Sequence, residues 1–486
     1  MLQGASLNVV NKKCFRKFYC FQMALNSFPF WIVFPLIFCF YWLIPSKSVA
    51  LKKWYLIIIS YLLYMNWKPT FAIVLFLVTM ITYGGGRLLE HSSQRKRTIW
   101  VFGFLTFLPL LVFKYYNFVN DNVLLCLKWM GLHFSLPGLN WAIPIGLSFF
   151  TFQAVGYLFD VYYKKSQVEK SLTDYVLFVS FFPQIASGPI SKASELLPQI
   201  KNPKPFNYNQ GVNGLKLLLW GMFLKTVIAD RLGIYVNLIY DNYASLSGKE
   251  CLLGTFFYSM QIYTDFAGYS FMAIGIAKLL GFNLINNFNR PYFSVSITDF
   301  WRRWHISLSR WLKDYVYIPL GGSRCSRIRN YWNILVTFLV SGIWHGANWT
   351  FIFWGLLHGI AQIVEKALKL QKLENGRVWV RLMRITVTFM IVNFFWIYFR
   401  MPTIEKTHSF VSNIFTNFSG NIHWGQYKYA LFLLIPIIKS VRDEFFPSQT
   451  MWMNRMVVRW FVYVILFAMI LLFGVLSSGQ FIYVNF

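Results

Sequence analysis

Residues 301–359 decide how this chain is interpreted, and they read WRRWHISLSRWLKDYVYIPLGGSRCSRIRNYWNILVTFLVSGIWHGANWTFIFWGLLHG. The first part contains one acid, Asp314, among the cations Arg302, Arg303, Arg310, Lys313, Arg324, Arg327 and Arg329. The second part carries no charge over residues 331–364. A helix rises about 1.5 Å per residue and crosses a bilayer in about 20 residues. The uncharged run is too long for one upright span, so we predict that it is tilted, broken or partly re-entrant.

His345 lies inside this uncharged run. An ionisable ring at membrane depth is costly unless it is paired or faces a wet cavity, so it is a functional-site hypothesis by default. The alternative is a packing histidine that hydrogen-bonds a backbone carbonyl. Gly342 and Gly346 favour the functional interpretation because glycine lets a backbone or substrate approach closely. His305, in the basic part, is the second candidate.

The composition is that of a membrane protein. Of 486 residues, 57% are hydrophobic and only 13% are charged, against about a quarter charged in soluble domains. The net charge of +29 comes from Lys and Arg between apolar segments, a pattern that orients membrane proteins and meets anionic lipid head groups. We therefore expect membrane lipid, and no nucleic acid, as the partner of these charges. The six cysteines form no CxxC pair, so neither a disulfide framework nor a metal site is indicated.

The order of apolar runs predicts an all-α polytopic integral membrane protein with about 10–12 transmembrane or re-entrant helices. The runs are 27–44, 54–67, 69–86, 98–113, 123–136, 141–159, 175–190, 211–229, 251–277, 331–364, 385–399, 429–438 and 460–476. Residues 87–97 are expected to form a polar basic loop. Residues 1–22 form a basic tail, with Met23 as an alternative start. Residues 23–486 are expected to form a single membrane domain with its core motifs at 286–359.

Several of these runs contain polar or helix-breaking residues. The phrase FFPQIASGPI at 181–190 predicts a broken helix. Lys216 and Lys225 either snorkel to an interface or line an aqueous path. Asp265 is interpreted as part of the turn of a helical hairpin. The alternative is that it is an acid on the wall of a polar cavity. Ser296 or Thr298 is expected to cap an amphipathic helix over 301–311 at the membrane surface.

Six phrases resemble the membrane-bound O-acyltransferase family, in its bacterial branch of alginate O-acetylation and teichoic acid D-alanyl transfer proteins. They are SFFTFQAVGYLFDVY (148–162), FVSFFPQIASGPI (178–190), YTDFAGYS (263–270), NNFNRPYFSVSITDFWRRWHISLSRWLKDYVYIPLGGSR (286–324), SGIWHGANWTFIFWGLLHG (341–359) and FFWIYFRMPTIEKT (394–407). The resemblance implies a ring of tilted helices around a central funnel that brings the acyl donor from the cytoplasm. It also implies that His345 is the catalytic residue and His305 a second important one. Many relatives carry an acid after GYS, where this chain has Phe271.

Transfer of an acyl group to a hydroxyl needs a base, a thioester donor and donors for the developing oxyanion. The ordinary pKa of an imidazole, about 6.5, leaves His345 mostly neutral at pH 7 and fit to be the base. The cations Arg302, Arg303, Arg310 and Lys313 are candidates for binding coenzyme A phosphates, and each is equally explained as a positive-inside anchor.

Two further polar residues follow His345. Asn348 is a candidate to orient the ring or the acyl carbonyl, or else packs the helix. His358 lies 13 positions beyond His345, about 220° around a straight helix at about 100° per residue, and is interpreted as structural.

The resemblance implies an O-acyltransferase of the bacterial cytoplasmic (inner) membrane. We expect no bound cofactor, acetyl-CoA or another acyl thioester as donor substrate, and O-acetylation of an envelope polysaccharide. A periplasmic SGNH-like acyltransferase or acceptor protein is the expected partner. The alternatives are a transporter or flippase that relays protons through Asp265, His305 and His345, and a non-catalytic scaffold.

Overall fold

The computed structural model describes residues 23–370, 377–446 and 455–475, and within them it contains helices and no strand. The basic tail predicted for residues 1–22 lies outside the described residues. The first half comprises α2 (Phe28–Leu43), α3 (Val49–Met65), α4 (Pro69–His91), α5 (Arg95–Leu110), η1 (Leu111–Tyr115), α6 (Tyr116–Trp129), α7 (Leu147–Tyr162), α8 (Leu172–Ser180), α9 (Phe182–Ile185), α10 (Ala193–Lys201), α11 (Tyr208–Met222), η2 (Phe223–Ala229) and α12 (Asp230–Asp241).

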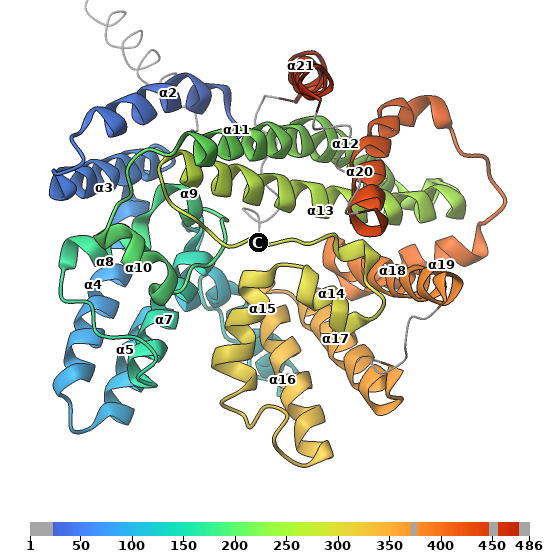
Figure 1. Cartoon of the computed structure of the whole chain (residues 1–486). Helices are drawn as coiled ribbons and strands as arrows, with labels where there is room; N and C mark the ends of the chain where they lie inside the picture. Colours follow the sequence, from blue (N-terminus) through green and yellow to red (C-terminus); the bar gives the residue numbers. More distant parts are fainter. Residues whose placement is uncertain (1–22, 371–376, 447–454, 476–486) are drawn as a thin grey trace, which may run out of the picture.

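The second half contains the motif helices. It comprises η3 (Tyr243–Ser245), α13 (Gly248–Leu279), η4 (Pro291–Phe293), α14 (Ile297–Arg303), α15 (Ile306–Leu312), η5 (Lys313–Tyr317), α16 (Arg327–His345), α17 (Trp349–Ala367), α18 (Val378–Arg400), α19 (Ile404–Thr416), η7 (Trp424–Leu433), α20 (Leu434–Phe445) and α21 (Met456–Phe473). In Figure 1, α11 and α13 cross the upper half of the view. The N-terminal helices lie on the left of the view, α18 and α19 lie beneath the right-hand part of α13, and α15 to α17 lie below the centre.

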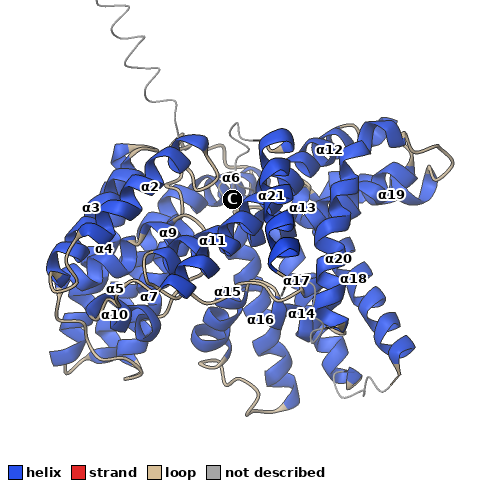
Figure 2. Ribbon diagram, turned by 45° about the horizontal axis from the view of Figure 1, so that its top comes forward, coloured by secondary structure: helices blue, strands red, loops and turns tan. Residues whose placement is uncertain are grey.

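Close backbone contact joins α11 to α13. A Cβ on Gly214 would lie 2.8 Å from the Gly275 carbonyl oxygen, and one on Gly221 would lie 2.6 Å from that of Gly268. Glycine is required at such crossings because any side chain would push the helices apart. Figure 2 shows the same two helices from a second direction. Besides α11, α13 packs against α12, α18 and α19.

The structure corrects two predictions about helix ends. The 251–277 run is not a hairpin turning at Asp265, because α13 continues without interruption from Gly248 to Leu279. The basic loop expected over 87–97 is wrong over most of its length, because α4 continues to His91 and α5 begins at Arg95. The Arg95 guanidinium donates to the carbonyl oxygens of Val161 (2.9 Å) and Tyr162 (3.0 Å). This cation thus stabilises the carbonyl end of α7.

The predicted breaks are confirmed. The 175–190 run divides into α8 and α9, and the 331–364 run divides at residues 346–348 into α16 and α17. Ser296 caps α14 by accepting from the backbone N–H of Asp299 at 3.0 Å, as expected. The helix over 301–311 is also interrupted, because His305 takes a left-handed conformation with φ 42° between α14 and α15.

Five helical segments of the described part are long and apolar enough to cross a membrane: Pro69–His91, Arg95–Trp129, Tyr208–Asp241, Val378–Arg400 and Met456–Phe473. Large apolar side chains such as Phe461, Val464 and Leu471 point outward from α21, as they do in helices surrounded by lipid. The all-α, polytopic membrane class is therefore confirmed. The count of 10–12 membrane elements stays a prediction.

Candidate active site

His345 is the last residue of α16, and the chain becomes extended at Gly346 directly after it. The imidazole lies among aromatic rings, with centroid distances of 4.9 Å to Trp344, 5.0 Å to Trp354 and 5.1 Å to Phe399. Only 2% of the residue is exposed. The break between the two helices thus delivers a titratable ring into a tightly packed aromatic surround.

Asn348 organises this break. Its Oδ1 accepts from the N–H of Thr350 at 3.0 Å, which caps α17, and its Nδ2 donates to the Pro402 carbonyl at 2.8 Å. Both ends of the amide are therefore used to fasten the start of α17 to the end of α18. This geometry matches the packing alternative for Asn348.

His305 lies on the other side of the same tryptophan. Its ring centroid is 5.9 Å from Trp344 and 4.6 Å from Phe266. Asn287 holds its loop by accepting from the N–H groups of Ile306 (3.0 Å) and Ser307 (3.1 Å). In the described part of the chain neither ring nitrogen of His305 has a hydrogen-bond partner. The two predicted histidines, distant in sequence, thus flank one indole.

His358 also comes close, because the break lets α17 fold back along α16. Trp354 lies between the two rings, 5.0 Å from His345 and 4.9 Å from His358. The indole N–H of Trp301 donates to Nδ1 of His358 at 3.2 Å. A straight helix would have turned His358 away, so the chain reversal decides its position. Its contacts fix the Trp301 ring.

A large cavity of about 630 Å³ opens beside these helices. Four cations line it: Arg302, Arg310, Lys313 and Lys366. Its buried lining includes Trp301, Ile334, Phe338 and Ser341. We call this space the basic cavity. It extends from charged, exposed residues to the α16 face that carries Ser341, one turn before His345.

The four cations that line the basic cavity have different surroundings. Arg302 and Lys313 are exposed and, among the described residues, have no ion-pair partner. Arg310 also lines the basic cavity but pairs with Glu195 at 2.6 Å. Lys366, which the sequence did not single out, donates to Oδ1 of Asn330. Two unpaired cations and two engaged ones therefore surround this cavity.

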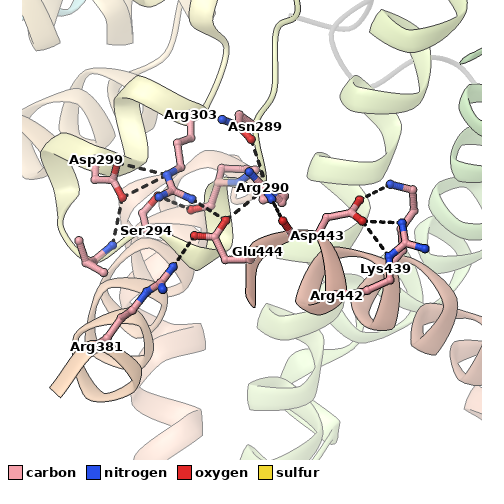
Figure 3. A network of polar contacts seen from close by, with 12 residues as sticks. Asn289, Arg290, Ser294, Asp299, Arg303, Arg381, Lys439, Arg442, Asp443 and Glu444 are labelled. Atoms are coloured by element: carbon pink, nitrogen blue, oxygen red, sulfur yellow. Dashed lines mark hydrogen bonds and ion pairs between the residues drawn. The ribbon is translucent and has the colours of Figure 1, made fainter. Parts of the chain in front are cut away.

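Arg303 points elsewhere. Its guanidinium contacts Asp299 at 3.1 Å and Glu444 at 3.0 Å (Figure 3). Glu444 also binds Arg381 at 2.8 Å and Arg290 at 3.3 Å. We call these five residues the Glu444 network. It joins α14, α18 and α20, and Arg303 is not among the residues that line the basic cavity.

Asp265 forms part of a buried ion cluster. Lys225 Nζ lies 2.6 Å from Oδ1 of Asp265 and 2.7 Å from Oδ1 of Asp230, and all three side chains are buried. Lys225 thus neither snorkels nor lines an open path. A buried carboxylate is tolerated when such a partner compensates its charge. Here the ion pair between Lys225 and Asp265 connects η2 to α13.

The sequence analysis missed Lys114, a buried cation in η1. Its Nζ donates to the carbonyl oxygens of Trp344 (2.6 Å) and His345 (3.1 Å) and to Ser148 Oγ (3.3 Å). Together with His345 and residues 143–149 it lines a pocket of about 20 Å³, room for roughly one or two water molecules. The signal was a lone lysine at the end of the apolar run 98–113.

This arrangement suits base-assisted group transfer. His345 lines the small pocket on the Lys114 side and lies one helical turn beyond Ser341, which lines the basic cavity, and aromatic rings surround the imidazole. Among the described residues, no group of three or more His, Cys, Asp or Glu side chains is placed to hold a metal ion.

Comparison with known proteins agrees with this chemistry. Residues 30–401 match the membrane-bound O-acyltransferase family. The chain is 36% identical over 391 residues to a peptidoglycan O-acetyltransferase of Helicobacter pylori, covering 74% of this chain and 73% of the relative. It is 35% identical over 393 residues to a probable alginate O-acetylase of Azotobacter vinelandii, covering 79% and 76%. It is also 29% identical over 274 residues to a teichoic acid D-alanyltransferase of Bacillus subtilis, covering 53% and 69%.

Proposed function

This chain belongs to the membrane-bound O-acyltransferase family and is a multi-pass membrane O-acyltransferase, and on that premise we propose that it carries acetyl from cytoplasmic acetyl-CoA through the membrane to a hydroxyl of an envelope polysaccharide. The observation that carries the proposal is the basic cavity. Its unpaired cations, Arg302 and Lys313, offer charge to the phosphates of coenzyme A. Its buried end reaches Ser341, one helical turn before the candidate base.

In this proposal His345 is the general base. It takes the proton of the acceptor hydroxyl while the hydroxyl oxygen attacks the thioester carbonyl carbon. The carbon–sulfur bond then breaks, and the proton passes to the departing thiolate. A positioned base contributes roughly 10²- to 10⁴-fold to such a step. His305 lies on the far side of Trp344, where Asn287 holds the two residues that follow it, and is the second histidine of the site.

The acceptor reaches His345 from the opposite side. The small pocket beside Lys114 supports this route, because His345 lines it and none of the four cations of the basic cavity does. A hydroxyl could approach the base there while the donor occupies the larger cavity. Two separate approaches to one base permit transfer across the membrane without movement of the donor.

We propose the bacterial cytoplasmic membrane as the location, with the basic cavity on its cytoplasmic side. The cations at its mouth agree with the positive-inside rule. Relatives named for peptidoglycan and alginate O-acetylation support an envelope polysaccharide as acceptor. A periplasmic SGNH-like acyltransferase or acceptor protein is the proposed partner for the last transfer.

The test uses membranes containing wild type, His345→Ala or His91→Ala at matched protein levels. His91 is the matched control, because its side chain is 78% exposed at the end of α4. Labelled acetyl-CoA and envelope fractions are supplied, and both labelled product and free thiol are measured. We expect wild type and His91→Ala to transfer label at similar rates. We expect the rate of His345→Ala to fall by at least about 10²-fold. Equal transfer by His345→Ala would exclude this base, and no transfer by wild type would exclude the donor.

A further inference from the structure

Ser341 is a buried hydroxyl at the inner end of the basic cavity. It is fully buried on α16, lines the cavity, and has no hydrogen-bond partner among the described residues. An unsatisfied buried polar group costs about 1–3 kcal/mol. Such a group next to a candidate base needs a physical explanation.

Several hydroxyls in the surrounding helices bond to a nearby carbonyl, whereas Thr151 and Thr350, like Ser341, have no hydrogen-bond partner among the described residues. Thr337, one turn earlier on α16 and also in the cavity lining, donates to the Asn333 carbonyl at 2.6 Å. Thr264 on α13 and Ser180 on α8 bond to the carbonyl four residues earlier, each at 2.7 Å. This local bond is the usual solution for Ser and Thr inside a helix. Ser341 makes no such bond and is one of the residues that line the basic cavity, so a bound ligand can supply the missing partner.

The helix places Ser341 and His345 on one face. Residues four apart on a helix have Cβ atoms about 5–6 Å apart. A thioester lying along the basic cavity with its phosphates near Arg302 and Lys313 would therefore bring its carbonyl to Ser341 before reaching His345. The neighbouring lining, Trp301 and Phe338, is apolar and buried, which strengthens a hydrogen bond made there.

We propose that the Ser341 hydroxyl donates a hydrogen bond to the thioester carbonyl oxygen and stabilises the oxyanion that forms when the acceptor attacks. This inference rests on the proposed function above. A carbon–oxygen bond forms to the acceptor, the carbon–sulfur bond breaks, and the acceptor proton passes through His345 to the thiolate. Ser341 keeps its own proton throughout. It is thus a catalytic residue that acts on charge and forms no covalent intermediate.

The test compares Ser341→Ala with Ser180→Ala, which removes a buried hydroxyl outside the basic cavity that already donates to the Val176 carbonyl. Both purified variants are assayed with labelled acetyl-CoA for kcat and for KM of the donor, and their thermal unfolding is followed. We expect Ser341→Ala to lose roughly 10²-fold in kcat. Its KM should stay within about twofold and its Tm should stay equal to or above wild type, because no native hydrogen bond is removed. Ser180→Ala should keep its kcat and lose some Tm, because it loses the hydrogen bond to Val176.

Each outcome separates this inference from the proposed function. If wild type transfers acetyl and Ser341→Ala matches its kcat, Ser341 is only a wall of the cavity and the inference is overturned. If Ser341→Ala loses activity together with Tm, the hydroxyl has a structural partner and the inference is again wrong. If wild type does not use acetyl-CoA, the proposed donor fails and the role of Ser341 fails with it.

Discussion

Arg302 and Arg303 are neighbours in the sequence with opposite surroundings in the structure. Arg302 is exposed, lines the basic cavity and has no ion-pair partner in the described part of the chain. Arg303 is held by Asp299 and by Glu444, a carboxylate 141 residues further along (Figure 3). The two arginines differ in whether a carboxylate pairs with them and not in the type of cation, so of the two only Arg302 is free for the phosphate contact proposed above.

The two regions should respond differently to mutation. In the Glu444 network the charges compensate one another, so removing one leaves others uncompensated and costs folding stability. In the basic cavity the charges of Arg302 and Lys313 face solvent. Removing them should therefore cost little folding stability and should weaken the binding of an anionic ligand. The predictions below test this division.

The largest effect is expected for Glu444→Ala. This carboxylate is buried and contacts Arg303, Arg381 and Arg290. Breaking a buried ion pair lowers the free energy of unfolding by about 3–5 kcal/mol. Because these arginines are partly exposed, we expect Glu444→Ala to lower it by roughly 3 kcal/mol. Unfolding in detergent measures it. The control is Asp241→Ala, whose carboxylate is 67% exposed and 3.8 Å from Arg400. Equal Tm losses for both variants would contradict the division.

The double variant Arg302→Ala/Lys313→Ala comes next. Two exposed charge contacts to phosphate, each worth up to about 1 kcal/mol, predict roughly a tenfold rise in KM for acetyl-CoA. The kcat and the Tm should stay near wild type, because no protein partner is lost. Steady-state kinetics and unfolding of the same preparation test both parts. A large fall in Tm with unchanged KM would mean that these two cations are structural anchors.

A conservative exchange sharpens the comparison. Arg303 uses two different guanidinium nitrogens to reach Asp299 and Glu444, and a single ammonium cannot occupy both positions. We therefore expect Arg303→Lys to lose about 1 kcal/mol of stability. Arg302→Lys keeps a mobile charge in the cavity and should change KM by less than about twofold. Thermal unfolding and steady-state kinetics are measured for both variants. A larger loss of stability in Arg302→Lys, or a larger change of KM in Arg303→Lys, would contradict the assignment of Arg303 to structure and of Arg302 to phosphate binding.

Ionic strength should produce the smallest effect. Salt screens exposed charges over a Debye length of about 10 Å at 0.1 M. KM for acetyl-CoA should rise about two- to threefold between 0.05 and 0.3 M salt in wild type. The Arg302→Ala/Lys313→Ala variant should show a nearly flat profile. An equally steep profile in both proteins would place the phosphate contacts on other residues.

The sequence predicted the parts of the fold that depend on local chain properties. Hydropathy identified the membrane class, and the length of the 331–364 run required the break that the structure has after His345. Proline and glycine predicted the division into α8 and α9. Asp265 was misplaced in a hairpin turn, because its charge suggested the end of a helix, whereas Lys225 compensates it in the middle of α13.

The sequence alone determined the basic stretch and the break in the chain, since each follows from the polarity or length of one segment, and it named His345 as the candidate base through its place in an uncharged run and through the family resemblance. Only the tertiary structure decided which cations face the cavity, that Lys114 binds carbonyl oxygens of residues 344 and 345, about 230 positions away, and that the Ser341 hydroxyl stays unpaired. The physical reason is that pairing between charges and hydrogen-bonding groups depends on which distant helices pack together. No local pattern records that choice.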